Sequence, residues 1–212
     1  MLKISTEFLG TALLLAVVTG SGIMGQQLSG GNDALALLGN SIATGCGLFV
    51  LISVLGPISG AHFNPAVTLY FWQQRALRDT EVFSYLCAQF SGAIAGVWLT
   101  HLMFHQALLQ ISTHVRSGAA QMLSELVSTL ILLTVIRLGL KHAPDKIPML
   151  VALTVTAGYW FTASTFFANP AVTLARSLTD TFVGIAPANV AGFVLAQLLA
   201  VLILMFCTKN NN

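Results

Sequence analysis

The sequence NPAVTL occurs twice, at residues 64–69 and 169–174, and both copies lie inside stretches that are otherwise almost wholly apolar. An Asn–Pro pair ordinarily marks a turn or the start of a helix, because proline has no backbone donor and fits the first helical position. The fold must therefore place two helix starts in apolar surroundings. No other feature of the sequence constrains the fold as strongly.

Composition and segment length indicate a membrane protein. Of the 212 residues, 56% are hydrophobic and 8% are charged, whereas about a quarter of the residues in a soluble domain are charged. The first apolar run could be a secretory signal because Lys3 precedes it, but Glu7 interrupts its start and no small-residue cleavage site clearly follows. We expect six membrane spans, the fifth of them short, at residues 8–25, 35–55, 82–104, 118–140, 148–163 and 187–207.

The distribution of basic residues predicts the orientation in the membrane. Six spans place both termini on one side, and lysine and arginine favour the cytoplasmic side. We therefore expect a multi-pass protein of the plasma (inner) membrane with both termini in the cytoplasm, and the net charge of +2 gives no reason to expect a nucleic acid partner. The residues counted as cytoplasmic are Lys3, Arg75, Arg78, Arg137, Lys141, Lys146 and Lys209, against Arg116 and Arg176 on the other side.

The sequence contains no pattern typical of a metal centre or an enzyme. Cys46, Cys87 and Cys207 fall in separate spans, with neither a CxxC motif nor a Cys/His cluster. No nucleophile and base are paired in a recognisable pattern. We expect no metal, no cofactor and no enzymatic activity.

The two halves of the chain repeat each other beyond the NPAVTL motif. Three matched segments in the same order indicate duplication of a three-span unit, and an odd number of spans forces the second unit to insert upside down. We expect a single channel domain over residues 1–212, with repeat one at about 1–105 and repeat two at about 118–209. The further matches are TEFLGTALLL (6–15) with SELVSTLILL (124–133), which pairs Glu7 with Glu125, and AQFSGAIAG (88–96) with AQLLAVLIL (196–204), which pairs Gln89 with Gln197.

Each NPAVTL motif is predicted to begin a helix that crosses only half of the membrane. The apolar stretch from Leu35 to Trp72 is too long for one span and breaks at residues 56–65, and about nine apolar residues follow Asn64. Irregular backbone at membrane depth persists only inside protein or beside a watery cavity. Two such half-helices, capped by Asn64 and Asn169, would meet near the midplane with positive dipole ends and amide donors, which favours neutral solutes over cations and protons.

These motifs resemble the major intrinsic protein superfamily, the aquaporins and glycerol facilitators, over essentially the whole chain. The resemblance implies an all-α membrane protein with six transmembrane helices plus two re-entrant half-helices in an inverted three-span repeat. It also implies a homotetramer with one pore in each subunit. The pore motif residues implied are Asn64, Pro65, Ala66, Asn169, Pro170 and Ala171.

The outer constriction departs from the family's usual pattern. An arginine usually follows the second NPA, whereas this chain has Val172 there. The resemblance places the other constriction positions at Thr44, Ala157 and Phe166, without the aromatic and histidine side chains that a water-selective member usually carries at the two helical positions. We therefore expect a wider pore. The valine also resembles bacterial members linked to arsenical efflux.

Charged and aromatic residues near the pore have more than one interpretation. Arg176 is either a displaced constriction arginine or, as we favour, a vestibule or structural residue, because Asp180 is spaced for a helical ion pair with it. Trp160 is expected to anchor at the interface, although a small change of helix phase would bring it to the constriction. His101 is expected to lie at the membrane interface.

Two glutamates inside predicted spans could serve proton coupling, since ionisable groups there are functional candidates by default. We favour a structural role in which Glu7 and Glu125 bind the non-helical backbone before each half-helix, with His62 in the same packed loop.

Taken with the resemblance, these features predict a passive channel for small uncharged solutes that excludes ions and protons. Candidate solutes are water, glycerol-like polyols and neutral arsenic or antimony hydroxides. The alternative is a secondary transporter, which also uses inverted repeats and broken helices. A transporter would need an ion or proton site near the midplane, for which Glu7 and Glu125 are the acidic candidates.

Overall fold

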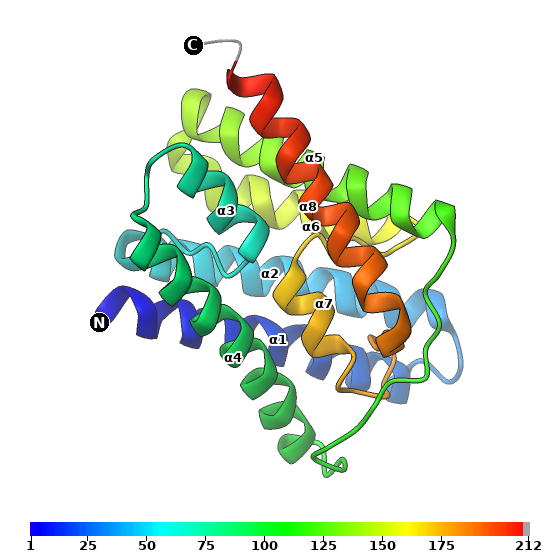
Figure 1. Cartoon of the computed structure of the whole chain (residues 1–212). Coiled ribbons are helices and arrows are strands. Elements are labelled where there is room, and N and C mark those ends of the chain that lie inside the picture. Colours follow the sequence, from blue (N-terminus) through cyan, green and yellow to red (C-terminus); the bar gives the residue numbers. More distant parts are fainter. Residues whose placement is uncertain (210–212) are drawn as a thin grey trace.

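The computed structural model of the chain describes residues 1–209, without the side chain of Lys209, so that side chain and residues 210–212 lie outside the described part. The described residues are helical and contain no strand (Figure 1). The helices are α1 (Leu2–Leu28), α2 (Asp33–Ser59), α3 (Pro65–Gln73), α4 (Asp79–Met103), α5 (Ala119–His142), the 3-10 helix η1 (Pro144–Lys146), α6 (Ile147–Phe161), α7 (Pro170–Arg176) and α8 (Pro187–Lys209).

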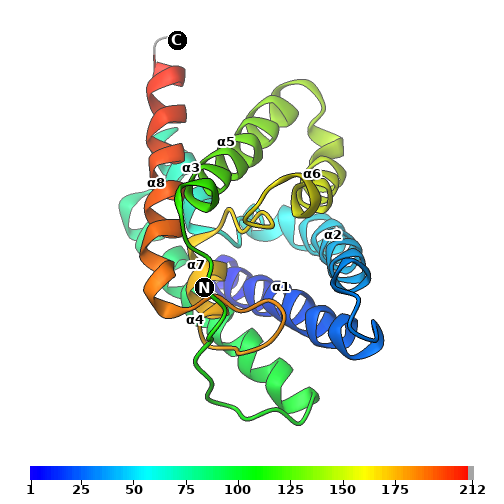
Figure 2. The same ribbon diagram turned by 90° about the vertical axis from the view of Figure 1, so that its right-hand side faces the viewer.

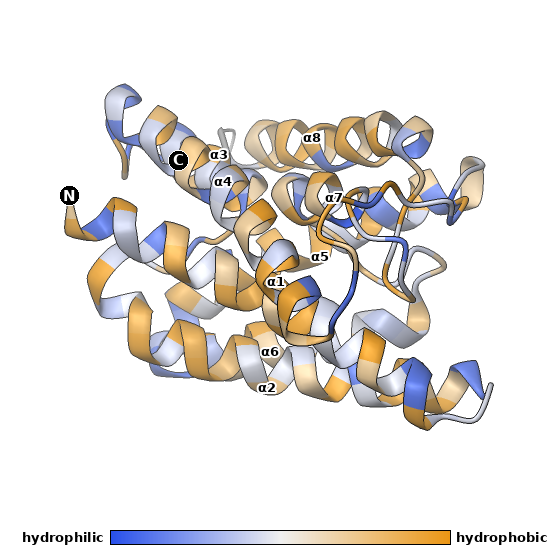
Figure 3. Cartoon of the chain, turned by 90° about the horizontal axis from the view of Figure 1, so that it is seen from below, coloured by the Kyte–Doolittle hydropathy of each residue, from blue (hydrophilic) through white to orange (hydrophobic). Residues whose placement is uncertain are grey.

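Six long helices correspond to the six predicted spans. Among the described residues, α1, α2, α4, α5 and α8 are long and apolar enough to cross a membrane. The sixth, α6, has 15 residues and is the short fifth span expected from the sequence. Apolar colouring runs along most of α8 in Figure 3. The fold is that of a multi-pass membrane protein.

The helices pack as two similar halves around the re-entrant segments. In the first half α1 contacts α2 and α4, and in the second half α5 contacts α6 and α8. The halves meet through α2 and α6, and each half-helix reaches into the other half, α3 against α8 and α7 against α4. Figure 2 shows the long helices arranged around the loops that lead into α3 and α7. This arrangement brings the two NPAVTL motifs together.

Glycines allow α1 and α4 to approach closely. A Cβ atom at Gly92 would collide with the carbonyl oxygen of Phe8, and one at Gly96 would collide with that of Ala12. Close backbone contact through small residues four apart is a common way for helices to associate in membranes. The small-residue stretch of α4 therefore serves helix packing.

The break between α2 and α3 is shorter than the sequence suggested. Helix α2 continues through Pro57 and ends at Ser59. Gly60 caps it in a left-handed conformation with φ of 90°, which glycine tolerates best. The non-helical segment therefore covers only residues 60–64 before α3 begins.

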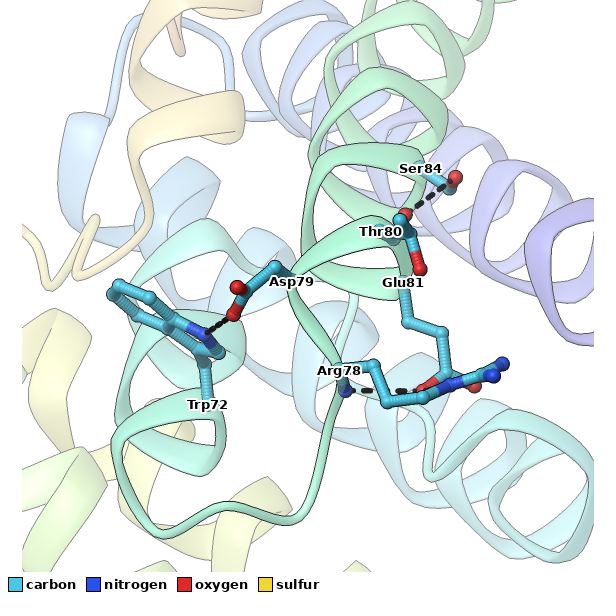
Figure 4. A network of polar contacts seen from close by, with 6 residues as sticks. All are labelled: Trp72, Arg78, Asp79, Thr80, Glu81 and Ser84. Carbon is cyan, nitrogen blue, oxygen red and sulfur yellow. Dashed lines mark hydrogen bonds and ion pairs between the residues drawn. The ribbon is translucent and has the colours of Figure 1, made fainter.

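Polar side chains fix the connection from α3 to α4, as Figure 4 shows. The indole Nε1 of Trp72 donates to Asp79 Oδ1 at 2.8 Å. The backbone N–H of Arg78 donates to Glu81 Oε2 at 3.0 Å, which satisfies a free donor at the start of α4. Trp72 is half-exposed, in keeping with an anchor at the membrane interface.

Candidate functional site

The asparagines of the two NPAVTL motifs cap α3 and α7 and bind each other's loops. Asn64 Oδ1 accepts from the N–H of Ala66 at 2.8 Å, and its Nδ2 donates to the carbonyl of Ala168 at 2.7 Å. Asn169 Oδ1 accepts from the N–H of Ala171 at 3.0 Å, and its Nδ2 donates to the carbonyl of Phe63 at 2.8 Å. Pro65 and Pro170 occupy the first helical positions. Each amide NH₂ has two hydrogens, so one remains available on each asparagine.

The loops before the half-helices have unusual backbone conformations at equivalent positions. Ala61 and Phe63 have positive φ in the first loop, and Phe166 and Ala168 have positive φ in the second. Such conformations cost about 1–3 kcal/mol each in non-glycine residues. Other interactions must therefore hold these loops in place.

Glu7 binds the first loop from α1. Its Oε1 accepts from the hydroxyl of Ser59 at 2.7 Å and the N–H of His62 at 3.0 Å. Its Oε2 accepts from the N–H of Phe63 and from Gln89 Nε2, both at 2.8 Å. A buried carboxylate with this many donors is satisfied by the loop that it orders.

Glu125 does the same for the second loop. Its oxygens accept from the N–H of Phe167 at 3.0 Å and of Ala168 at 2.9 Å, and Gln197 Nε2 donates to it at 2.6 Å. Gln197 also donates to Thr173 at 2.9 Å, and the matching bond from Gln89 goes to Thr68. The repeat in the sequence pairs the two glutamines but does not indicate their role, although a polar residue repeated in two apolar segments is a signal of one.

A cavity runs past both asparagines. Its volume is about 130 Å³, whereas one water molecule needs about 10–15 Å³ on this measure. Its wall is largely aliphatic and aromatic, and among the described residues that line it there is no aspartate or glutamate. Of the residues singled out from the sequence, those that line it are Thr44, His62, Asn64, Phe166, Asn169, Val172 and Arg176.

Ala157 is not among the lining residues, so its placement at the constriction was wrong. The residue is exposed on the outer face of α6, and Tyr159 lines the cavity instead, with its hydroxyl 3.2 Å from Thr44 Oγ1. Two residues along a helix turn the side chain by about 200°. Counting back from Asn169 crosses the irregular loop after Phe161, and the count gave a residue on the opposite face of the helix.

Arg176 lies in the cavity wall, and the ion pair with Asp180 that its spacing suggested does not form. Helix α7 ends at Arg176, so the two residues do not share a helix face. The guanidinium is buried, its Nε donates to the carbonyl of Val183, and its carbon lies 3.5 Å from the centre of the Phe167 ring. Asp180 is exposed and accepts instead from the N–H of Thr113 at 2.8 Å.

The segment after α7 is fastened to the connection between α4 and α5. The N–H and hydroxyl of Thr113 both donate to Asp180, and these bonds hold the pKa of that carboxyl below its usual value. His101 is fully buried, with Nε2 at 2.8 Å from Thr179 Oγ1. His101 lies in the last turn of α4, near the end of the span as expected, but its ring joins α4 to this segment and does not reach outward to the interface.

Trp160 points away from the cavity. The residue is half-exposed, and its Nε1 donates to Ser41 Oγ on α2 at 3.1 Å. The change of helix phase that would bring it to the constriction does not occur.

Two opposed half-helices, each capped by an asparagine beside one continuous cavity and enclosed by six apolar helices, define an intramembrane channel for small solutes. The chain belongs to the major intrinsic protein family, because the model of that family matches residues 1–163. The family expected from the NPA motifs is thereby confirmed.

Two relatives and one solved structure agree with this assignment. The chain is 54% identical over 193 residues to aquaglyceroporin AqpS of Rhizobium meliloti (strain 1021), an alignment that covers 91% of this chain and 82% of that protein. It is 32% identical over 119 residues to the propanediol uptake facilitator PduF of Salmonella typhimurium, covering 55% of this chain and 44% of the relative. The aquaglyceroporin from Plasmodium falciparum has the same fold, with a TM-score of 0.74 and 21% identity over 96% of this chain and 93% of that one.

Proposed function

We propose that this protein is a passive membrane channel for water and small uncharged polyols, with a pore that runs along the cavity between the two asparagines. The observation that carries the proposal is the reciprocal bonding of Asn64 and Asn169, which fixes both amides in the wall of one cavity. A solute oxygen can accept from the remaining hydrogen of each amide.

The loops offer acceptors to the same solute. Residues 60–62 and 166–167 line the cavity, and among the described residues no donor binds their carbonyl oxygens. An unpaired backbone carbonyl at membrane depth is costly unless water or a solute meets it. The pore thus combines fixed donors and acceptors on one side with an apolar wall on the other, which suits small hydroxylated molecules.

Ion and proton exclusion follows from the charges near the centre. The half-helices direct the positive ends of their dipoles at the cavity. Glu7 and Glu125 do not line the cavity, and their oxygens are occupied by loop donors. A transporter would need a carboxylate that meets the solute or a coupling ion, so these contacts favour a channel over the secondary transporter.

The solutes proposed are water, glycerol and similar polyols, and neutral hydroxides of arsenic and antimony. Polyols are consistent with the names of the two relatives, an aquaglyceroporin and a propanediol uptake facilitator. The metalloid hydroxides are compact, uncharged and hydroxylated, and Val172 leaves the position after the second NPA without a long side chain.

Assembly and orientation are part of the proposal. The resemblance to the family supports a homotetramer in the plasma membrane with one pore in each subunit. The excess of basic residues at the α3–α4 and α5–α6 connections supports cytoplasmic termini. The repeat boundaries at about 1–105 and 118–209 are supported by the matched contacts of Glu7 and Glu125.

A solute panel in proteoliposomes tests this function. Vesicles are mixed with a hyperosmotic solution of glycerol, propanediol or arsenous acid and followed by light scattering. Those with the protein should shrink faster than protein-free vesicles, because water leaves faster, and should then re-swell faster, because the solute enters faster. Sodium and proton leak should equal that of empty vesicles. A protein correctly assembled in the vesicles that speeds none of these solutes would refute the proposal.

A further inference from the structure

The two repeats place different pairs of side chains at equivalent positions of the cavity. His62 lies two residues before Asn64 and stacks on Phe71, with ring centroids 4.8 Å apart and planes at 17°. In the second repeat Phe167 and Arg176 take these positions, and the guanidinium carbon lies 3.5 Å from the ring centroid. All four residues line the cavity. The second repeat thus puts a cation where the first has an aromatic ring.

These pairs lie toward opposite ends of the cavity. Figure 1 shows α3 and α7 extending to opposite sides of the molecule from the region where their motifs meet. Phe71 and Arg176 each stand six residues beyond the first helical position, which is about 9 Å along the helix. The cationic pair is therefore in the half of the pore that α7 enters, one helical turn beyond Val172.

Arg176 has donors that no described residue satisfies. Its exposed fraction is 2%. Its Nε donates to the carbonyl of Val183, and among the described residues its two terminal nitrogens have no acceptor and no carboxylate partner. A guanidinium has five N–H donors, and a buried cation without partners is strongly unfavourable. An oxygen inside the cavity would supply what the protein does not.

The backbone around Arg176 fixes the position of its side chain. The N–H of Ile185 donates to the carbonyl of Arg176 at 3.2 Å, which folds the following segment back so that Val183 faces the guanidinium. The N–H of Ser112 donates to the carbonyl of Ser177 at 2.9 Å and fastens that segment to the α4–α5 connection. The cation is held by stacking on Phe167 and by one hydrogen bond to the carbonyl of Val183, in a loop that is itself bonded to the α4–α5 connection.

We propose that Arg176 is the fixed cation of the pore half that α7 enters, where it repels cations and donates to the oxygens of the passing solute. This inference rests on the proposed channel function and deepens it. The solute class it selects is neutral and rich in acceptor oxygens. In this chain the cationic role belongs to a residue one turn beyond position 172 and depends on the ring of Phe167.

Arg116 provides a matched control. Its guanidinium also lies over the Phe167 ring, at 5.3 Å, and its Nε donates to the carbonyl of Gly184 at 2.8 Å. It does not line the cavity. The same substitution at Arg116 and Arg176 therefore compares a cation outside the pore with one inside it.

The test measures sodium leak and glycerol flux of vesicles that contain the wild-type protein, Arg176→Met, Arg176→Lys or Arg116→Met. We expect Arg176→Met to raise sodium leak about tenfold, the size of effect expected from one strong charged interaction. Arg176→Lys and Arg116→Met should keep sodium excluded. Equal leak from wild-type and Arg176→Met vesicles, with glycerol still conducted, would overturn the inference and leave the channel function standing. Wild-type vesicles that take up glycerol no faster than protein-free vesicles would refute the channel function instead.

Chemical rescue keeps the inference testable if Arg176→Met misfolds. In a chain whose three native cysteines are changed to serine, Arg176→Cys is treated with aminoethyl methanethiosulfonate, which adds a cation, or with methyl methanethiosulfonate, which adds none. Only the cationic reagent should restore sodium exclusion. Equal restoration by both reagents would assign the effect to bulk, and a thiol that reacts with neither would show that position 176 does not face the pore. Either result would overturn the inference.

Discussion

At the scale of single residues, the half of the pore that α7 enters is defined by the contrast between Val172 and Arg176. Both side chains line the cavity, and one helical turn separates them. The sequence was sufficient to identify the departure at position 172, because the NPA motif fixes its register. It was not sufficient to place Arg176 or Tyr159, because the loop between α6 and α7 and the segment after α7 set those positions through tertiary contacts.

Installing an arginine at position 172 should narrow the pore. In Val172→Arg a long side chain with five donors would enter a cavity that already contains Arg176. Glycerol flux should fall about tenfold or more while water flux falls much less, as measured by light scattering on vesicles. Val172→Met, similar in length but uncharged, separates bulk from charge. Equal loss of both fluxes would point to a plugged or misfolded protein, and no change in either would show that position 172 does not restrict the pore.

Placing a negative charge between the half-helices should weaken the cation barrier. Asn169→Asp removes the donor to the carbonyl of Phe63 and sets a carboxylate beside the positive end of α7. Sodium leak should rise in Asn169→Asp and in the equivalent Asn64→Asp. Asn32→Asp makes the same change at the exposed cap of α2 and should leave the leak at the wild-type level. Unchanged leak in both pore variants would place the barrier elsewhere.

At the scale of elements, the half-helices depend on buried glutamates in other helices. The motif pair and the nine apolar residues after Asn64 were enough to predict half-helices. The pairing of Glu7 with Glu125 suggested which residues support them. The partner atoms could not be predicted, because the left-handed residues of each loop aim their N–H groups in directions that no periodic pattern encodes.

Neutralising one glutamate should destabilise its loop. In Glu125→Gln an amide NH₂ replaces an oxygen that accepts from backbone N–H groups, so at least one donor is left unpaired. We expect a loss of about 1–3 kcal/mol in the free energy of unfolding and lower glycerol flux, and a similar result for Glu7→Gln. Asp145→Asn, at an exposed carboxylate, is the control. Full stability with altered proton leak would favour a proton-coupling role for the glutamates.

Helix contact between α1 and α4 should be sensitive to a single methyl group. In Gly96→Ala the new Cβ would collide with the carbonyl oxygen of Ala12 and force the helices apart. Overpacking of this kind costs about 1–3 kcal/mol, and thermal unfolding in detergent measures it. Gly39→Ala is the control, since a Cβ at that position meets no atom. If both variants melted at the wild-type temperature, the α1–α4 contact would be looser than described.

At the scale of the whole molecule, hydropathy, the inverted repeat and two motifs were enough to predict the architecture. All six spans appear where the apolar segments indicated, since the bilayer sets both their length and their composition. Helix ends differ by several residues, because polar end residues continue the helices beyond the apolar core, as at the start of α1. His101 and Ala157 lie in helices, but irregular segments decided both outcomes. The loop after Phe161 upset the count that gave Ala157, and the segment after α7 packs against His101 and buries it.

The equilibrium distribution of labelled glycerol in proteoliposomes tests most directly whether the whole assembly is a passive channel. Glycerol is added outside vesicles that hold an imposed pH gradient and, separately, an imposed sodium gradient, and its internal concentration is followed to a plateau. A passive channel should give faster entry than in protein-free vesicles and a plateau equal to the external concentration under every gradient. A plateau above the external concentration that collapses with either gradient would contradict it and identify a secondary transporter.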